Sequence, residues 1–309
     1  MPSSISSSDR LAANRKKHDE RLISMAKSKE DQFFLATVAA AFLVLFFGWA
    51  AAVPYMPETF PVLNQGEINR ARIVRYEHSP VRPIVLSGTS LMERISPEYF
   101  TQDVANIALA GESTVVSASF AARKNPPILL IEANILDRET SSVSTLHSRF
   151  STTPVRAAVA AMFQLDKIAA QQSAHLRDDV GKMLTRGPAD SPPAEGVLQS
   201  YRSWNSRPLH AELNKESASE LAAIADGVEA NGGQVFYILL PVHPVLERST
   251  YYRRGLEFLR DVDPEFDRRL LAVRWSSEIR WDPDGAHVDE RSAVVIARQI
   301  EEAVSLLRN

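Results

Sequence analysis

The sequence predicts an α/β domain whose central sheet is mostly parallel, preceded by one transmembrane helix. Residues 33–53, FFLATVAAAFLVLFFGWAAAV, contain no charged residue. After them, short apolar runs alternate with segments of helical periodicity. Strands that alternate with helices are joined by right-handed crossovers, which place helices on both faces of a parallel sheet. We therefore expect a three-layer sandwich behind a membrane anchor.

Bulk composition limits the classes of function. The chain has 309 residues, a formal net charge of -3 and no cysteine. This length accommodates one sizeable domain and an anchor. The small net charge provides no large basic field, which argues against a nucleic-acid partner. The lack of cysteine excludes disulfides and thiolate metal sites and fits either redox compartment. We expect neither a cofactor nor a metal ion.

The uncharged run at residues 33–53 is long enough to cross a membrane as a helix. At about 1.5 Å rise per residue it covers about 30 Å, the thickness of the hydrocarbon core. Trp49 and Tyr55 lie near its C-terminal end, where aromatic rings favour the membrane interface. Pro54 and Pro57 then end the helix.

Basic residues lie on the N-terminal side of this run. They are Arg10, Arg15, Lys16, Lys17, Arg21, Lys27 and Lys29. After the run no Lys or Arg occurs until Arg70. This asymmetry predicts a cytoplasmic tail at residues 1–32 and places everything after Pro54 on the far side of the inner (cytoplasmic) membrane.

Two other interpretations of the apolar run compete with an uncleaved anchor. Ala50, Ala51 and Ala52 offer small residues to a signal peptidase. However, the polar leader is long and the apolar run exceeds a usual signal-peptide core. A buried core helix is the other alternative, but apolar residues surround this helix on all faces. An anchor explains the segment best.

The rest of the chain divides into a linker, residues 54–80, and an exported domain, residues 81–309. Short apolar runs typical of buried strands cover residues 83–86, 104–108, 128–133 and 235–240, with a weaker candidate at 272–279. Helical patterns cover residues 114–123, 154–184, 211–230 and 289–307. Residues 185–193 are rich in turn-forming residues and predict a loop. In such sheets ligands bind at the carboxyl ends of the strands.

Three candidate site residues follow the first three predicted strands. Ser90, in Gly-Thr-Ser-Leu, lies where the chain turns into the next element and can present its hydroxyl and N–H to a ligand. An N-cap serine is the simpler interpretation. Gly111 could bring a backbone N–H close to a ligand, or could be a turn glycine. Asn134 is either a structural hydrogen-bonding residue or a donor aimed into the cleft.

Asp284 and His287 provide a fourth candidate, in the segment WDPDGAH just before the last helix. An Asp three residues ahead of a His in a loop with glycine can fold back, so that its carboxylate holds one imidazole nitrogen. The other nitrogen is then available to take a proton from a serine. Taken alone, His287 is better interpreted as a surface histidine.

These four blocks, in this order and setting, resemble the SGNH, or GDSL-type, hydrolase superfamily over roughly residues 83–309. The resemblance implies the SGNH, flavodoxin-like form of the three-layer fold. It implies that Ser90 is the nucleophile, His287 the general base and Asp284 the residue that orients it. The N–H groups of Ser90 and Gly111 and the side-chain amide of Asn134 would form the oxyanion hole, each donor contributing about 3 kcal/mol in the transition state.

The chain departs from the family pattern at two positions. Thr89 stands where the first block usually has Asp. Glu132 stands in Glu-Ala-Asn-Ile, where many members have Gly-x-Asn-Asp. The second departure keeps Asn134 but alters its surroundings, so Asn134 is the least secure of the assignments.

A single anchor with an exported SGNH domain is similar to membrane-anchored proteins that O-acylate cell-surface polymers. That resemblance implies an O-acyltransferase, in particular an O-acetyltransferase, acting on an exopolysaccharide through an acyl-serine intermediate. It also implies a polytopic membrane-bound O-acyltransferase as partner, because a tether raises local concentration at a membrane donor. An esterase that removes acyl groups from a glycan or lipid, and a non-catalytic scaffold of an export complex, remain alternatives.

Overall fold

The computed structural model describes residues 31–48, 65–134, 136, 165–188, 195–197, 199, 211–247 and 250–307. The chain forms two compact units. One contains residues 1–60 and 156–166, and the other contains residues 61–155 and 167–309. The predicted tail up to residue 30 and residues 49–53 of the predicted anchor lie outside the described residues.

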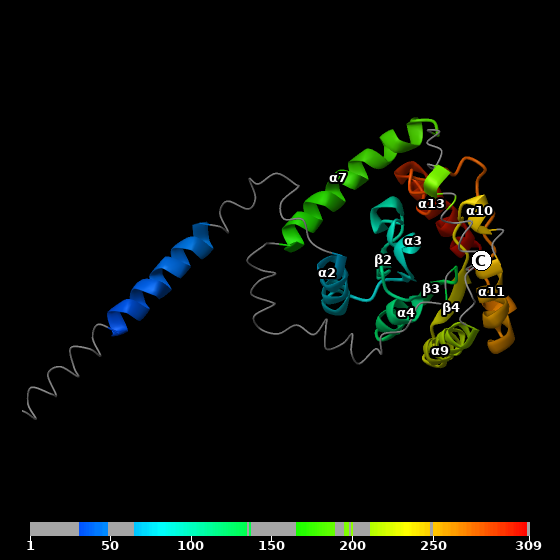
Figure 1. Ribbon diagram of the computed structural model, residues 1–309, viewed down its shortest axis with the longest axis horizontal. Helices are drawn as coiled ribbons and strands as arrows, with labels where there is room; N and C mark the ends of the chain where they lie inside the picture. Colours follow the sequence, from blue (N-terminus) through cyan, green and yellow to red (C-terminus); the bar gives the residue numbers. More distant parts are fainter. Residues whose placement is uncertain are drawn as a thin grey trace, which may run out of the picture. The chain divides into compact units, whose positions relative to one another are not determined.

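The first unit contains an apolar helix, Asp31–Gly48, drawn in blue in Figure 1. Its mean hydropathy is 1.8 over 18 residues, and none of it is buried. Its large exposed side chains include Phe33, Phe34, Leu35, Val38, Phe42, Leu43, Val44, Leu45 and Phe47. By length and composition this helix can cross a membrane.

The second unit contains a sheet of four parallel strands. They are β1 (Ile84–Ser87), β2 (Val104–Asn106), β3 (Ile128–Glu132) and β4 (Gln234–Ile238). Their order is β2-β1-β3-β4, and β1 pairs with both β2 and β3. The four continuous apolar runs are therefore confirmed as strands of an α/β fold. Since all four strands run in one direction, their carboxyl ends share one edge.

The weaker candidate at residues 272–279 is not a strand. Leu270 makes an isolated parallel bridge with Tyr237, and regular pairing goes no further. Beyond it the chain turns, because the Ser276 hydroxyl accepts from the N–H of Glu278 over 3.1 Å. The indole of Trp275 donates to the Leu239 carbonyl over 3.0 Å, so a side chain, rather than a backbone ladder, holds this segment to the end of β4.

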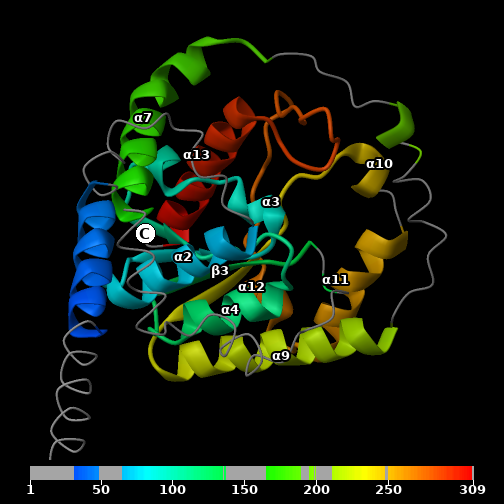
Figure 2. The same cartoon turned by 60° about the vertical axis from the view of Figure 1, so that its left-hand side comes forward.

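Helices connect and flank the strands (Figures 1 and 2). They are α2 (Gln65–His78), α3 (Ser90–Glu93), the 3₁₀ helix η2 (Pro97–Tyr99), α4 (Thr114–Ala122), α7 (Leu165–Thr185), α9 (Ala211–Ala230), α10 (Pro244–Glu247), α11 (Thr250–Val262), α12 (Phe266–Arg269) and α13 (Glu290–Leu307). The predictions for α4, α9 and α13 are confirmed to within a residue. The predicted helix at residues 154–184 matches α7 from Leu165 onward, and its first part lies outside the described residues.

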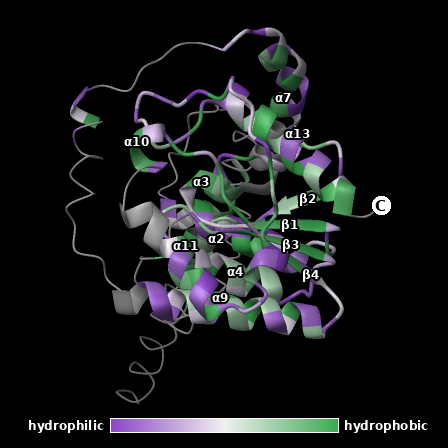
Figure 3. Ribbon diagram, turned by 90° about the vertical axis from the view of Figure 1, so that its right-hand side faces the viewer, coloured by the Kyte–Doolittle hydropathy of each residue, from purple (hydrophilic) through white to green (hydrophobic). Residues whose placement is uncertain are grey.

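Alternate residues of the strands pack into two separate cores. Ile84 and Leu86 of β1 join a cluster with buried residues of α13. Val85, between them, joins a second cluster with residues of α4 and α9. The strands are accordingly mostly hydrophobic, and Figure 3 draws much of the sheet in green. The two clusters fix the sheet from both faces and so hold the strand ends in place.

Helix α2 occupies part of the segment expected to be a linker, residues 54–80. Its inward positions, 69, 72, 73 and 76, have the helical spacing i, i+3, i+4 and i+7. Ile73 and Tyr76 are buried, but Asn69 and Arg72 fill the other two positions. Because half of the inward positions are polar, the sequence shows no apolar periodicity there.

Candidate active site

Ser90 is the first residue of α3, directly after the turn that follows β1. The N-cap of this helix is Thr89, whose side chain accepts a hydrogen bond from the Leu91 N–H. The structure therefore does not support the simpler interpretation of Ser90 as an N-cap serine. Ser90 is half-buried, in contrast to Thr89, which is fully buried. The local structure leaves Ser90 as the accessible member of the Gly-Thr-Ser turn.

The backbone N–H groups around Ser90 are nearly all in hydrogen bonds. Acceptors exist for the N–H groups of Gly88, Thr89, Leu91, Met92 and Glu93. Within the described part of the chain, neither the N–H nor the hydroxyl of Ser90 has a hydrogen-bond partner. An unbound N–H beside an unbound hydroxyl on a half-buried residue is the arrangement that a nucleophilic serine with its own oxyanion donor requires.

The loop that carries His287 is closed by backbone contacts on both sides. Trp281 and Val288 form an antiparallel bridge, and the Asp282 N–H donates to the His287 carbonyl over 2.8 Å. Gly285 has a φ of 68°, a conformation that favours glycine and lets the loop reverse. The reversal brings Asp284 back toward His287.

Asp284 holds His287 through backbone and side chain together. Its Oδ1 accepts from the backbone N–H groups of Ala286 and His287, each over 3.0 Å. Its Oδ2 lies 2.6 Å from Nδ1 of His287. Burial acts to raise the pKa of the Asp284 carboxyl, but these hydrogen bonds outweigh burial and lower the pKa overall. An ionised carboxylate at Nδ1 selects the tautomer in which Nε2 of a neutral imidazole can accept a proton.

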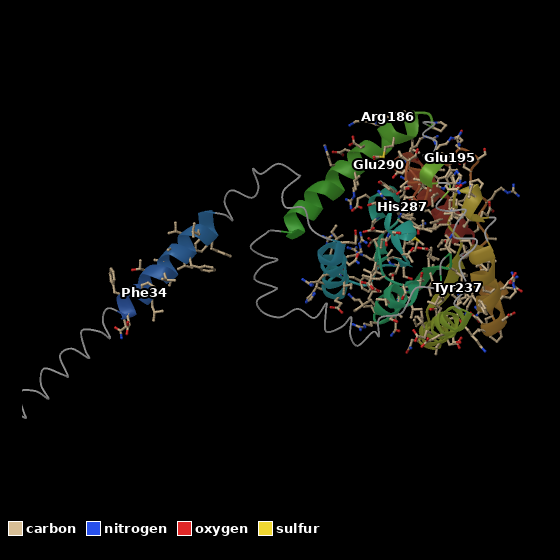
Figure 4. All side chains as sticks on the ribbon, in the orientation of Figure 1. Phe34, Arg186, Glu195, Tyr237, His287 and Glu290 are labelled. Atoms are coloured by element: carbon tan, nitrogen blue, oxygen red, sulfur yellow. The ribbon has the colours of Figure 1, made fainter. Side chains whose placement is uncertain are left out.

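The His287 loop is attached to the segment that begins with Ser90. Arg94, one helical turn after Ser90, lies 3.9 Å from the Asp282 carboxylate in the His287 loop. Tyr99 hydrogen-bonds to Glu290, and burial with this neighbouring carboxylate raises the pKa of the tyrosine. Figure 4 labels His287 and Glu290. Ser90 and His287 share no hydrogen bond in the described part of the chain, and such contacts often tighten only when substrate binds.

Gly111 lies in an exposed turn next to the Ser90 turn. The Leu109 N–H donates to the Gly88 carbonyl over 2.9 Å, which joins the two turns. Helix α2 supports the segment from the other side, because Asn69 donates to the Ala110 carbonyl over 2.9 Å. Gly111 has a φ of 83°, and a Cβ there would meet nothing within 4 Å. The turn-glycine interpretation is therefore correct for its backbone, and a contribution of its N–H to ligand binding stays a prediction.

Asn134 joins the ends of β3 and β4. Its amide donates to the Leu240 carbonyl over 2.8 Å, and its carbonyl oxygen accepts from the Leu240 N–H over 2.8 Å. The side chain is 2% exposed. Asn134 thus acts as a structural hydrogen-bonding residue, one of the two roles expected for it. Its contribution to an oxyanion hole stays a prediction.

Sequence reasoning did not assign a role to Glu132, which the structure places against the Ser90 turn. Its carboxylate is fully buried and accepts from the Thr89 N–H over 2.8 Å and from the Thr89 hydroxyl over 2.9 Å. A carboxylate that ends a continuous buried strand must find hydrogen-bond donors. The sequence Ile-Leu-Leu-Ile-Glu carried that signal, although it did not reveal which donors the carboxylate would find.

Comparisons of the chain with protein-family models, with curated proteins and with solved structures found no match. Among the described residues no group of three or more His, Cys, Asp or Glu could hold a metal ion.

Proposed function

We propose that the chain is a membrane-anchored O-acyltransferase of the SGNH type that acts outside the cytoplasm. Its proposed task is to transfer an acyl group, most simply acetyl, to a cell-surface or exopolysaccharide through an acyl-Ser90 intermediate. The observation that carries the proposal is the Asp284–His287 pair on a loop that Arg94 ties to the Ser90 helix. The finer architecture proposed is the three-layer sandwich of the SGNH hydrolases, in keeping with the two cores that pack against the sheet.

In the first step, the Ser90 hydroxyl attacks the carbonyl carbon of the acyl donor. His287 Nε2 takes the hydroxyl proton, and Asp284 stabilises the resulting imidazolium. The N–H groups of Ser90 and Gly111, with the Asn134 amide, stabilise the negative oxygen of the tetrahedral intermediate. The bond to the donor's leaving group then breaks, and His287 returns the proton to that group.

In the second step, a sugar hydroxyl of the polymer attacks the acyl-serine ester. His287 accepts the proton of that hydroxyl, the acyl–oxygen bond to Ser90 breaks, and Ser90 regains its proton. Water in place of the sugar hydroxyl gives the esterase reaction, so the two activities share every residue of the site and differ only in the acceptor.

The N-terminal helix supports the membrane part of the proposal. Asp31–Gly48 is long and apolar enough to cross a membrane, and the basic residues before it favour a cytoplasmic N-terminus. In the proposed topology the α/β domain lies on the periplasmic side of the cytoplasmic membrane. There a polytopic membrane-bound O-acyltransferase could deliver the acyl group, and the tether raises the concentration of the domain at such a partner.

The proposal is tested by the ester content of the surface polymer in a strain that carries Ser90→Ala in place of the natural chain. We expect esterification to fall, with the variant present at normal level by immunoblot. A rise would identify an esterase. Unchanged ester content would contradict the proposed role on that polymer and favour the scaffold alternative. A strain carrying Ser79→Ala, a change in a serine at the other end of the strands, provides the matched control.

A further inference from the structure

One buried carboxylate holds the turn that presents Ser90. Glu132 is the last residue of β3 and is fully buried. Its Oε2 accepts from the Thr89 N–H over 2.8 Å and from the Met92 N–H over 3.2 Å. The Thr89 hydroxyl lies 2.9 Å from Oε1. The carboxylate therefore hydrogen-bonds to the backbone on both sides of Ser90, at Thr89 and at Met92.

The same contacts leave Ser90 itself unbound. Glu132 uses the N–H groups of residues 89 and 92, and within the described residues the N–H and hydroxyl of Ser90 have no partner. A side chain that fixes a turn through the neighbours of the nucleophile restricts the nucleophile's position without competing for its hydroxyl. This is what preorganisation of an attacking group requires.

Close packing shows that the carboxylate and the turn fit each other. A Cβ on Gly88 would lie 2.5 Å from Oε2 and 2.7 Å from Cβ of Glu132. The backbone at Gly88 therefore approaches Glu132 more closely than any residue with a side chain would allow. The first residue of the Gly-Thr-Ser turn is explained by the position of Glu132.

We propose that Glu132 is a positioning residue that holds Ser90 in the orientation needed for nucleophilic attack, with Thr89 as its principal partner. This inference rests on the proposed function of Ser90. It extends that function by assigning the attack geometry to a buried carboxylate on the neighbouring strand. Glu132 acts through residues 88, 89 and 92 and does not touch the substrate.

Glu132→Gln is the first variant that tests the assignment. The glutamine has nearly the same volume, but its NH₂ group cannot accept a hydrogen bond. It therefore loses the bond that the carboxylate accepts either from the Thr89 hydroxyl or from the two backbone N–H groups. With the full chain in detergent micelles and p-nitrophenyl acetate as substrate, we expect kcat to fall by about 10- to 100-fold while KM stays within about twofold. Unchanged kcat in a folded variant would overturn the proposal.

Glu301→Gln provides a matched control for the loss of a capping carboxylate. Glu301, on α13, accepts from the N–H groups of Thr101 over 2.9 Å and Gln102 over 2.6 Å. This site precedes β2 and so lies at the amino ends of the strands. We expect Glu301→Gln to lower the melting temperature as Glu132→Gln does and to retain wild-type kcat. An equal loss of kcat in both variants would show that Glu132 contributes only general stability and would overturn the assignment.

Two substitutions of Thr89 keep the inference testable if Glu132→Gln does not fold. Thr89→Val removes the hydroxyl at nearly constant volume, and Thr89→Ser retains it. We expect the valine variant to have the lower kcat at similar KM, and equal kcat values would contradict the proposal.

Ser90→Ala separates the positioning role of Glu132 from the proposed function of Ser90. Wild-type turnover in Ser90→Ala would remove the proposed function itself. Turnover that is lost in Ser90→Ala but not in Glu132→Gln would remove only the positioning role.

Discussion

The carboxylate of Asp284 contacts the imidazole of His287 with Oδ2 2.6 Å from Nδ1. The contact fixes the tautomer in which Nε2 can act as a base. Asp284→Asn should therefore lower the turnover of p-nitrophenyl acetate by about 10²- to 10⁴-fold with little change in KM. Asp103→Asn, which removes an exposed carboxylate that pairs with Arg82 at the amino end of β2, should leave turnover unchanged. Equal rates in Asp284→Asn and the wild type would remove Asp284 from the mechanism.

The ion pair between Arg94 and Asp282 links the Ser90 helix to the His287 loop. Both side chains are partly exposed, so a double-mutant cycle of Arg94→Ala and Asp282→Ala should give a coupling energy of only about 0.2–1 kcal/mol in stability. Turnover should still fall by a few fold in each single variant and no further in the double variant, because either change frees the loop. Additive losses of turnover would show that the two residues act independently. The same cycle at Arg82 and Asp103, an exposed pair away from the site, should leave turnover unchanged.

Gly111 and Gly232 form a matched pair for testing the turn beside Ser90. Their φ angles are 83° and 85°, and a Cβ on either would meet nothing within 4 Å. Alanine at either position should cost roughly 1–2 kcal/mol of backbone strain. Only Gly111→Ala should lower turnover, because only that turn would offer an N–H to the oxyanion. Equal turnover in the two variants would exclude the Gly111 N–H from the oxyanion hole.

Arg269 stabilises the fold through a buried ion-pair network. Its guanidinium contacts Asp263 over 2.8 Å and Glu229 over 2.7 Å, and its side chain is 2% exposed. Arg269→Met leaves Asp263 buried without this partner and should destabilise the domain by about 3–5 kcal/mol in urea unfolding. Arg268→Met, which removes a more exposed arginine beside it, should cost less than about 1 kcal/mol. A loss of similar size in both variants would contradict this account.

The same network predicts how stability depends on pH. Burial acts to raise the pKa of Glu229, but hydrogen bonds from Arg269 and Arg268 outweigh it and lower the pKa to about 2. Because the folded pKa lies below the unfolded value, Glu229 stabilises the fold above the unfolded pKa of about 4.3. That contribution is lost as the pH falls toward 2. Urea unfolding of the wild type and Arg269→Met should therefore give curves that converge on acidification.

Much of this fold follows from local sequence patterns. The four strands were predictable because continuous apolar runs of strand length end in turn residues, and α9 because Asn-Gly-Gly closes its helical pattern. The Asp-x-x-His spacing likewise predicted the contact between Asp284 and His287, because a short loop can bring residues three positions apart together. Helix α2 was not predictable, because Asn69 and Arg72 interrupt its apolar periodicity. Their inward positions depend on partners far away in the sequence, Ala110 for Asn69 and Glu93 for Arg72.

The contact between Thr89 and Glu132 shows what a sequence pattern alone does not contain. Both residues are departures from the SGNH pattern, and they lie 43 residues apart in the sequence. In the fold the Thr89 hydroxyl lies 2.9 Å from the Glu132 carboxylate. An Asp in place of Thr89 would bring a second carboxylate against Glu132, and two adjacent carboxylates cannot both ionise at low cost. The two departures are therefore compatible with each other. The sequence does not show this, because the two residues come into contact only through the pairing of β1 with β3.

The most direct measurement for the central claim is covalent capture at Ser90. The full chain in detergent would be treated with a fluorophosphonate, digested and analysed by mass spectrometry. We expect a single adduct on the peptide that contains Ser90, absent in Ser90→Ala, formed much more slowly in His287→Ala and formed at the wild-type rate in His78→Ala. A wild-type chain that folds but acquires no adduct at Ser90, or labelling that does not depend on His287, would contradict the account.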